Sequence, residues 1–332
     1  MSNYRIFGSE LSPYSVKVRS YFRYKGLPHE WIPRSPAVQA EFQKYAKLPL
    51  VPLVVTPEGE GAQDSTPIIE RLEASRPEPS IVPDNAALAF ISALLEEYGD
   101  EWGNKWMFHY RWRYQPDAWS TAERIAQQMM GAQGTLAVAQ ARAAVAERMM
   151  GRLGFVGSND RTQPAIEASF KRTLAFLEAH LHTRPYMLGG RPAMADFGLW
   201  GQFYEAATDP TPGAIMRASS PKVMAWVQRM VSPKSQGPFE AWSALASTLM
   251  PLLRDEVGAL FLPWTVANAA AIERGDKSFE MTLGGASWSQ EPQKYHARAL
   301  AEIRRKYAAA KGAPGLETIL KESGCLPYLT AP

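Results

Sequence analysis

Cysteine is almost absent from this chain, which contains a single one, Cys325, among its 332 residues. One cysteine cannot form an intramolecular disulfide, so the sequence excludes a small secreted fold held by disulfides and favours a reducing compartment. The first residues, Met1 to Phe7, contain no apolar signal core. No stretch reaches the roughly 18 apolar residues of a membrane span. We therefore expect a cytoplasmic protein with no membrane partner.

A strong excess of charge of either sign is also missing. The formal net charge is +3, and the densest basic run covers only residues 109–114. Because a nucleic-acid surface requires concentrated basic residues, no nucleic-acid partner is expected. The five histidines include no His-x-x-x-His pair, and the chain has no glycine-rich phosphate loop and no Gly-x-Ser-x-Gly motif. The sequence therefore predicts neither a metal site nor a nucleotide site.

The N-terminal part combines strand and helix signals. Residues 4–7 and 29–32 have strand character, and a helix is predicted between them over residues 12–25, with a serine cap, proline in its first turn and Gly26 at its end. A strand, a helix and a second strand in one sheet imply parallel strands joined by a right-handed crossover.

A short helix, two strands and a third helix are predicted next. Residues 37–45 have helical composition, and Pro52 marks the start of a strand at residues 53–55, because proline does not fit a central ladder. Residues 61–63 are its weak partner. Ser65 is predicted to cap the third helix.

The chain beyond a proline-rich linker at residues 76–85 is predicted to be helical, with no convincing strand. A chain of 332 residues, of which 46% are apolar, is expected to form about two domains with a substantial apolar core. Helical periodicity marks residues 86–113, 121–153, 166–181, 195–207, 221–231, 242–253 and 292–310.

Three short motifs lie where the first helix, the third strand and the third helix begin. They are Ser12-Pro13-Tyr14, Val51-Pro52 and Asp64-Ser65. In this order of elements they resemble the cytosolic glutathione transferase superfamily, over approximately residues 4–231. The resemblance implies glutathione as cosubstrate and a small hydrophobic electrophile as second substrate.

An α+β fold of two domains is what this resemblance implies. A thioredoxin-like, glutathione-binding domain would occupy residues 1–80, and an all-α domain lining the second-substrate site would occupy residues 86–332. Within the latter, residues 232–332 exceed the usual family length, and the sequence assigns them no chemistry. A homodimer is expected as well.

Ser12 would activate the glutathione sulfur according to the same resemblance, with Tyr14 as the alternative donor. A thiol with a pKa near 8.5 is mostly protonated at neutral pH. A hydroxyl at a helix N-terminus favours the thiolate through a hydrogen bond and the helix dipole. From the residues alone, Ser12 is better explained as a helix cap, whereas a packed aromatic explains Tyr14 as well as a donor role does.

Val51, Pro52, Asp64 and Ser65 would bind glutathione. The resemblance implies a cis proline, with the Val51 backbone pairing with the cysteinyl part as an added strand would. Ser65 at a helix N-terminus would hold the γ-glutamyl carboxylate, and Asp64 would meet its ammonium group. The family commonly has Gly followed by Lys or Gln before Val-Pro, which this chain lacks. The candidates for the missing glycyl contact are Arg34, Lys44 and Lys47.

The part of the long helix near residues 96–113 would line the second-substrate pocket, with Trp102, His109 and Arg111 as candidate contacts. An aromatic stripe at helical spacing is more often core, and this alternative stays open. Near residue 193 the chain resembles a buried capping box of the family, in which Ala193 replaces the usual Ser or Thr and leaves Asp196 to reach the backbone alone.

The predicted activity is that of a glutathione transferase, in which the thiolate attacks an electrophilic small molecule. A non-catalytic protein of the same fold, used for ligand binding or protein association, is the first alternative. A glutathione-dependent reductase or lyase is the second, although disulfide exchange is disfavoured because Ser12 is not a cysteine.

Overall fold

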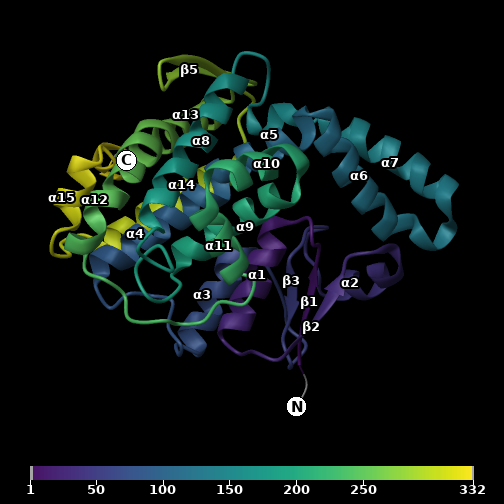
Figure 1. The fold of residues 1–332 in the computed structure, drawn as a ribbon, viewed down its shortest axis with the longest axis horizontal. Helices are drawn as coiled ribbons and strands as arrows, with labels where there is room; N and C mark the ends of the chain where they lie inside the picture. The colour runs from purple at the N-terminus through teal and green to yellow at the C-terminus, as the bar shows by residue number, and fades with distance from the viewer. Residues whose placement is uncertain (1–2, 331–332) are drawn as a thin grey trace.

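A small mixed sheet and a large helical body make up the computed structural model, which describes residues 3–330 (Figure 1). The sheet has the strand order β2-β1-β3-β4. β2 runs parallel to β1, whereas β3 is antiparallel to both β1 and β4. The predicted parallel unit is therefore confirmed. The strands are β1 Tyr4–Gly8, β2 His29–Pro33, β3 Leu53–Val55 and β4 Gly61–Gln63.

Helices cover both faces of this sheet. Successive side chains of a strand point to opposite faces, so Ile6 packs in the same core as α1 (Pro13–Tyr24) and α3 (Ser65–Ser75). Phe7 points the other way and packs on Phe42 of α2 (Gln39–Tyr45), with ring centroids 5.9 Å apart. A short 3-10 helix, η1 (Pro36–Val38), precedes α2. This layering is the expected thioredoxin-like arrangement.

The two helices that open at the predicted motifs begin differently. The Ser12 hydroxyl oxygen accepts a hydrogen bond from the Ser15 amide at 3.3 Å, so Ser12 caps α1 as predicted. The prediction that Ser65 caps α3 is wrong, because Ser65 is the first helical residue and Asp64 occupies the cap position. Asp64 adopts a φ of 78°, which turns the chain sharply at the end of β4.

One continuous helical stretch covers residues 86–113, as predicted, but its middle is a π-helix. It consists of α4 (Ala86–Glu97), η2 (Tyr98–Gly103) and α5 (Asn104–Arg113). The next helical range divides into a hairpin of two helices that projects from the body (Figure 1). The following elements are α6 Gln115–Met130, η3 Gly131–Gln133, α7 Thr135–Met150, η4 Leu153–Val156, α8 Gln163–His180, α9 Met194–Thr208, α10 Pro210–Ser219 and α11 Pro221–Arg229.

Asp196 bonds to backbone groups before α9, which confirms the predicted role. Its carboxylate accepts hydrogen bonds from the Ala193 and Met187 amides, each at 2.9 Å, and from the Trp226 indole at 2.9 Å. Burial raises the pKa of Asp196 to about 7. These bonds join α9 to α11 and to the loop that precedes it.

Residues 232–330 contain a β-hairpin that was not predicted. The expectation of no strand after the linker is wrong, because β5 and β6 pair antiparallel around Gly284 and Gly285. The φ angles of these glycines are 58° and 81°, as a two-residue hairpin turn requires. The elements are α12 Trp242–Leu252, η5 Leu253–Phe261, α13 Leu262–Arg274, β5 Phe279–Leu283, β6 Ala286–Gln290, α14 Lys294–Ala310, α15 Leu316–Glu322 and α16 Leu326–Thr330.

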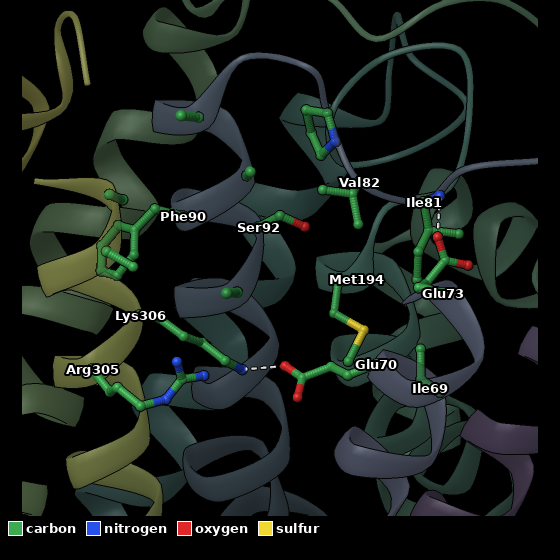
Figure 2. Close-up of a pocket in the computed structure, with 16 residues that line it drawn as sticks. Ile69, Glu70, Glu73, Ile81, Val82, Phe90, Ser92, Met194, Arg305 and Lys306 are labelled. Atoms are coloured by element: carbon green, nitrogen blue, oxygen red, sulfur yellow. Dashed lines mark hydrogen bonds and ion pairs between the residues drawn. The ribbon is translucent and has the colours of Figure 1, made fainter. Parts of the chain in front are cut away.

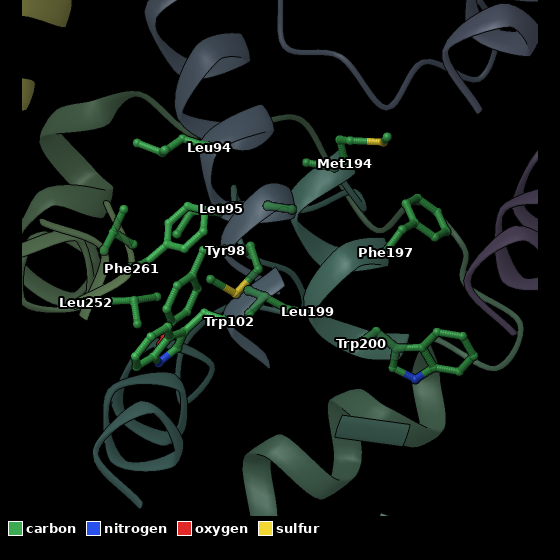
Figure 3. Packing of buried hydrophobic residues seen from close by; sticks show 14 of the residues in the cluster. Leu94, Leu95, Tyr98, Trp102, Met194, Phe197, Leu199, Trp200, Leu252 and Phe261 are labelled. Carbon is green, nitrogen blue, oxygen red and sulfur yellow. The ribbon is translucent and has the colours of Figure 1, made fainter. Parts of the chain in front are cut away.

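The C-terminal elements share one apolar core with the rest of the molecule. Figure 3 shows Tyr98 and Trp102 from η2 beside Phe261 from η5. The Tyr98 and Phe261 ring centroids are 6.0 Å apart, and Trp102 lies 5.6 Å from Trp264 and 5.5 Å from Trp288. Residues 232–330 are therefore part of the packed body and not an appended tail.

Candidate functional site

A cavity of about 590 Å³ lies beside the Val51-Pro52 peptide bond, which is cis. Tyr14 from α1, Asp64 and Ser65 at the start of α3, and residues of the loop before β3 line it. Its volume is in the usual range for small-molecule sites. The structure thus brings together five of the predicted residues, Tyr14, Val51, Pro52, Asp64 and Ser65.

The backbone of Val51 is open to a ligand. Neither its amide nor its carbonyl has a hydrogen-bond partner among residues 3–330, since the pairing of β3 starts at Leu53. An unpaired amide and carbonyl at the wall of a cavity can bind an extended peptide by strand addition. The donor and acceptor pattern at Val51 therefore fits the backbone of a tripeptide such as glutathione.

Gln63, which sequence reasoning did not select as a site residue, fixes the loop before the cis bond. Its side-chain amide donates to the carbonyls of Leu48 at 2.8 Å and Leu50 at 2.7 Å. Its carbonyl oxygen accepts from the amides of Lys47 at 2.8 Å and Leu48 at 3.0 Å. Four bonds from one side chain hold this wall of the cavity. In the sequence, the only feature that points to Gln63 is its position directly before Asp64.

Asp64 presents a carboxylate to the same cavity. The hydroxyl of Tyr295, on α14, lies 3.4 and 3.5 Å from its two oxygens. Desolvation raises the pKa of Asp64, and the nearby Lys17 ammonium counteracts that effect. Ser65, which follows, is buried in the first turn of α3. Amides in the first turn of a helix have no intrahelical acceptor and attract anions.

The two candidate thiol activators are placed differently. Tyr14 lines the cavity, and its hydroxyl donates to the carbonyl of Asp100 at 3.0 Å. Burial, followed by the charges of Glu101 and Asp100, raises the pKa of Tyr14 well above 10, so the hydroxyl keeps its proton at neutral pH. Ser12 is half-buried and is not among the residues that line the cavity.

A buried ion cluster lies behind Tyr14. The ammonium of Lys17 is 2.5 Å from Glu96, 2.6 Å from Asp100 and 3.1 Å from the hydroxyl of Thr66. Burial lowers the pKa of Lys17, but Asp100 and Glu96 outweigh it and raise that pKa overall, whereas desolvation raises the pKa of Asp100 to about 8. The cluster ties α1 and α3 to α4 and η2.

Trp102, His109 and Arg111, the candidates for the second-substrate pocket, do not lie on this cavity. Each is buried and bonded inside the protein. Their partners are Ser169 at 2.8 Å for Trp102, Ser158 at 2.7 Å for His109, and Glu205 at 2.7 Å and Asp209 at 2.6 Å for Arg111. The structure places all three in the core, because η2 and α5 are covered by α8, α9 and the C-terminal elements.

Two residues of the cavity come from a segment without any predicted chemistry. Tyr295 and Arg298 of α14 line the cavity together with the residues of the sheet domain. No sequence signal links them to Asp64, which is 231 residues away from Tyr295. Among residues 3–330 there is no group of His, Cys, Asp or Glu that could hold a metal ion, and no helix is long and apolar enough to cross a membrane.

Several solved structures resemble the chain at low identity. A glutathione S-transferase from Methylobacterium radiotolerans in complex with glutathione sulfonate is 20% identical, with a TM-score of 0.42, over 72% of this chain and 96% of that one. One from Rhodospirillum rubrum is 16% identical, with a TM-score of 0.46, over 73% and 98%. The beta-etherase LigF from Sphingobium is 17% identical, with a TM-score of 0.45, over 75% and 99%. No curated protein matches the chain.

Family models match both parts of the fold. The glutathione S-transferase N-terminal domain matches residues 6–80, which contain most of the sheet and the cavity residues Val51 to Ser65. The glutathione S-transferase C-terminal domain matches residues 136–229. Together the two segments cover about half of the 332 residues, in the order that the fold requires. The chain belongs to the cytosolic glutathione transferase superfamily.

Proposed function

We propose that the protein binds glutathione in the cavity beside Pro52 and activates its thiol for attack on an electrophilic small molecule. The observation that carries the proposal is the unpaired backbone of Val51 in the same cavity as Asp64 and Ser65. Val51 would pair with the cysteinyl part, and Asp64 would meet the ammonium group. The first turn of α3 would bind the neighbouring carboxylate.

Tyr14 is the thiol activator that we propose first, because its side chain lines the cavity. A hydroxyl that keeps its proton can donate a hydrogen bond to a thiolate and so lower the pKa of the thiol. Its single proton now goes to the carbonyl of Asp100, so donation to sulfur requires that bond to break. Ser12 is the alternative: its hydroxyl oxygen accepts from the Ser15 amide, which leaves the hydroxyl proton available for donation.

The decisive experiment compares Tyr14→Phe and Ser12→Ala. With bound glutathione, the thiolate absorbance in the ultraviolet is followed against pH, after calorimetry has shown that each variant binds. We expect a thiol pKa below its usual value of about 8.5 in the wild type and an increase of roughly one unit in Tyr14→Phe only. An increase in Ser12→Ala alone would assign the role to Ser12.

Tyr24→Phe is the matched control, since Tyr24 is also on α1 and its buried hydroxyl has no hydrogen-bond partner in the structure. In this variant the thiol of bound glutathione should titrate at the same pH as in the wild type. A wild-type protein that releases no heat with glutathione would refute the proposal as a whole.

We also propose that the second substrate is a small hydrophobic electrophile, that the protein forms a homodimer and that it is cytoplasmic. The family membership supports a dimer, and light scattering after gel filtration tests it: a mass equal to that of one chain would refute it. The one cysteine, which is free and buried, fits a reducing compartment.

A non-catalytic binding protein is the second candidate. It is favoured by the internal hydrogen bond of Tyr14, whose one proton is donated to the Asp100 carbonyl, and by the position of Ser12, which does not line the cavity. Such a protein would bind glutathione in calorimetry, yet leave the pKa of its thiol at the value found in free solution. The titration described above separates the two candidates.

A further inference from the structure

Helix α14 brings two polar side chains to the cavity from outside both family domains. Tyr295 and Arg298 are three residues apart, so they lie on one face of the helix. Both line the cavity, and both lie beyond residue 229, where the second family match ends. Their contribution is therefore specific to the C-terminal part of this chain.

The position of α14 is fixed along its length. Near its start, His296 bonds to the buried carboxylate of Glu101, and its ring packs on Trp264 with centroids 4.7 Å apart. Near its end, Lys306 forms an ion pair with Glu70 of α3 at 2.6 Å (Figure 2). Figure 2 also shows α14 lying along α4, with the labelled Phe90 between the two helices. Tyr295 and Arg298 are thus presented to the cavity by a packed helix.

Among the residues that the structure describes, the cavity contains one carboxylate, that of Asp64, and two guanidinium groups, those of Arg71 and Arg298. The Asp64 carboxylate accepts from the Tyr295 hydroxyl, which orients it. Arg71 is already paired with Glu60 at 2.7 Å, whereas Arg298 has no ion pair or hydrogen bond within residues 3–330. An unpaired guanidinium beside a cavity is suited to a carboxylate, which it can bind through two parallel hydrogen bonds.

Lys47, a second cation of the cavity without an acidic partner among residues 3–330, lies in the loop that leads to Val51. It is therefore close in the chain to the residue that we propose to pair with the cysteinyl part. Arg298 shares its helix face with Tyr295, whose hydroxyl reaches Asp64, and Asp64 directly precedes Ser65. A ligand group that meets Asp64 and the first turn of α3 thus lies on the α14 side of the cavity.

We propose that α14 is part of the ligand site: Arg298 joins the first turn of α3 in binding the α-carboxylate of the γ-glutamyl residue of glutathione, and Tyr295 is a positioning residue that holds Asp64 toward the ammonium group. This inference rests on the proposed function. It assigns a binding role to the segment at residues 232–332, which the family domains do not include.

The test is calorimetry with two ligands, glutathione and γ-aminobutyryl-cysteinyl-glycine, which is the same peptide without the γ-glutamyl α-carboxylate. Arg298→Gln should weaken glutathione binding about tenfold or more, because a charge-assisted pair is lost. It should leave the Kd of the truncated peptide within about twofold. Tyr295→Phe should weaken both ligands by a similar factor, since both retain the ammonium group that Asp64 meets.

Arg305→Gln is the matched control, because Arg305 is exposed on the same helix, outside this cavity, and the substitution removes the same charge. It should bind both peptides as the wild type does. An Arg298→Gln protein that binds glutathione normally, or that loses both peptides equally, overturns the inference while the proposed function stands. A wild type that binds no glutathione overturns both.

Discussion

Lys17 is a charged residue held in the protein interior by partners that are far away in the sequence. Its ammonium contacts Glu96 and Asp100, which are 79 and 83 residues further along the chain. Removal of one partner from a buried ion pair leaves an uncompensated charge in the protein interior, which strongly destabilises the fold. The helix at residues 12–25 was predicted from the sequence, but the burial of Lys17 could not be, because it depends on how α4 packs against α1.

Replacement of Lys17 by Met should destabilise the fold strongly. The variant keeps the length of the side chain but leaves the Glu96 carboxylate and the carboxyl group of Asp100 buried without their cation. We expect a loss of about 3–5 kcal/mol in the free energy of unfolding, measured by urea denaturation. Lys321→Met removes a lysine from an exposed pair with Glu317 and should change little. Equal effects of the two substitutions would contradict the account of the cluster.

The candidate site shows what residue types can and cannot reveal. Val51, Pro52, Asp64 and Ser65 were predicted from two short motifs, and the structure brings them to one cavity. The Val51-Pro52 motif indicates a particular backbone conformation. That is sufficient to predict a binding role for Val51, because its backbone is the group proposed to bind the ligand. The choice between Ser12 and Tyr14 depends on where side chains point in the first turn of α1, and spacing alone does not determine that.

Helix packing sets the position of the first turn of α1. Gly201 on α9 lies so close to it that an added Cβ would be 2.6 Å from the carbonyl oxygen of Pro13. Only glycine allows this approach of two backbones. The contact matters for the site, because Pro13 directly precedes Tyr14. The sequence predicted a helix at residues 195–207, but not which of its residues would meet α1.

Gly201→Ala should therefore disturb the cavity through the backbone. The methyl group must push α9 and the start of α1 apart, and such overpacking typically costs about 1–3 kcal/mol. We expect a lower melting temperature and weaker glutathione binding in calorimetry. Gly154→Ala is the control, since Gly154 has open space around its missing Cβ and an ordinary φ. Unchanged stability of Gly201→Ala would show that α9 can yield without cost.

Elements were predictable where their signals were local. The helices at residues 13–24 and 65–75 follow proline and capping patterns, and the structure contains both. The hairpin of β5 and β6 was missed although Gly284 and Gly285 are a known turn signal, because its two strands have only five residues each and lie between helices. The function of α14 could not be predicted, since it arises from a long-range contact with Asp64.

At the scale of the whole molecule, buried polar contacts join the C-terminal elements to the family domains. Glu256 of η5 accepts hydrogen bonds from the Tyr98 hydroxyl at 3.2 Å and from the Ser169 hydroxyl, and it pairs with Arg172 at 2.8 Å. One carboxyl thus links three separate parts of the chain. Such an arrangement makes it unfavourable for residues 232–330 to unfold separately from the rest, because that would leave these polar groups unpaired.

The same carboxyl should give stability a characteristic pH dependence. Desolvation raises the pKa of Glu256 to about 7, although Ser169 and Arg172 counteract it. A raised pKa in the folded state means that the contribution of Glu256 is complete below its unfolded pKa near 4.5 and is lost as the pH rises through about 7. Glu256→Gln carries no titrating proton and should not show this loss.

We therefore expect the free energy of unfolding of the wild type, relative to Glu256→Gln, to fall by about 3 kcal/mol between pH 4.5 and pH 8. Urea denaturation at closely spaced pH values measures the difference, and the exposed Glu291→Gln should give a curve parallel to that of the wild type. Parallel curves for wild type and Glu256→Gln would mean that the carboxyl is ionised throughout. In that case the ion pair with Arg172, and not a buried proton, would be what joins η5 to α8.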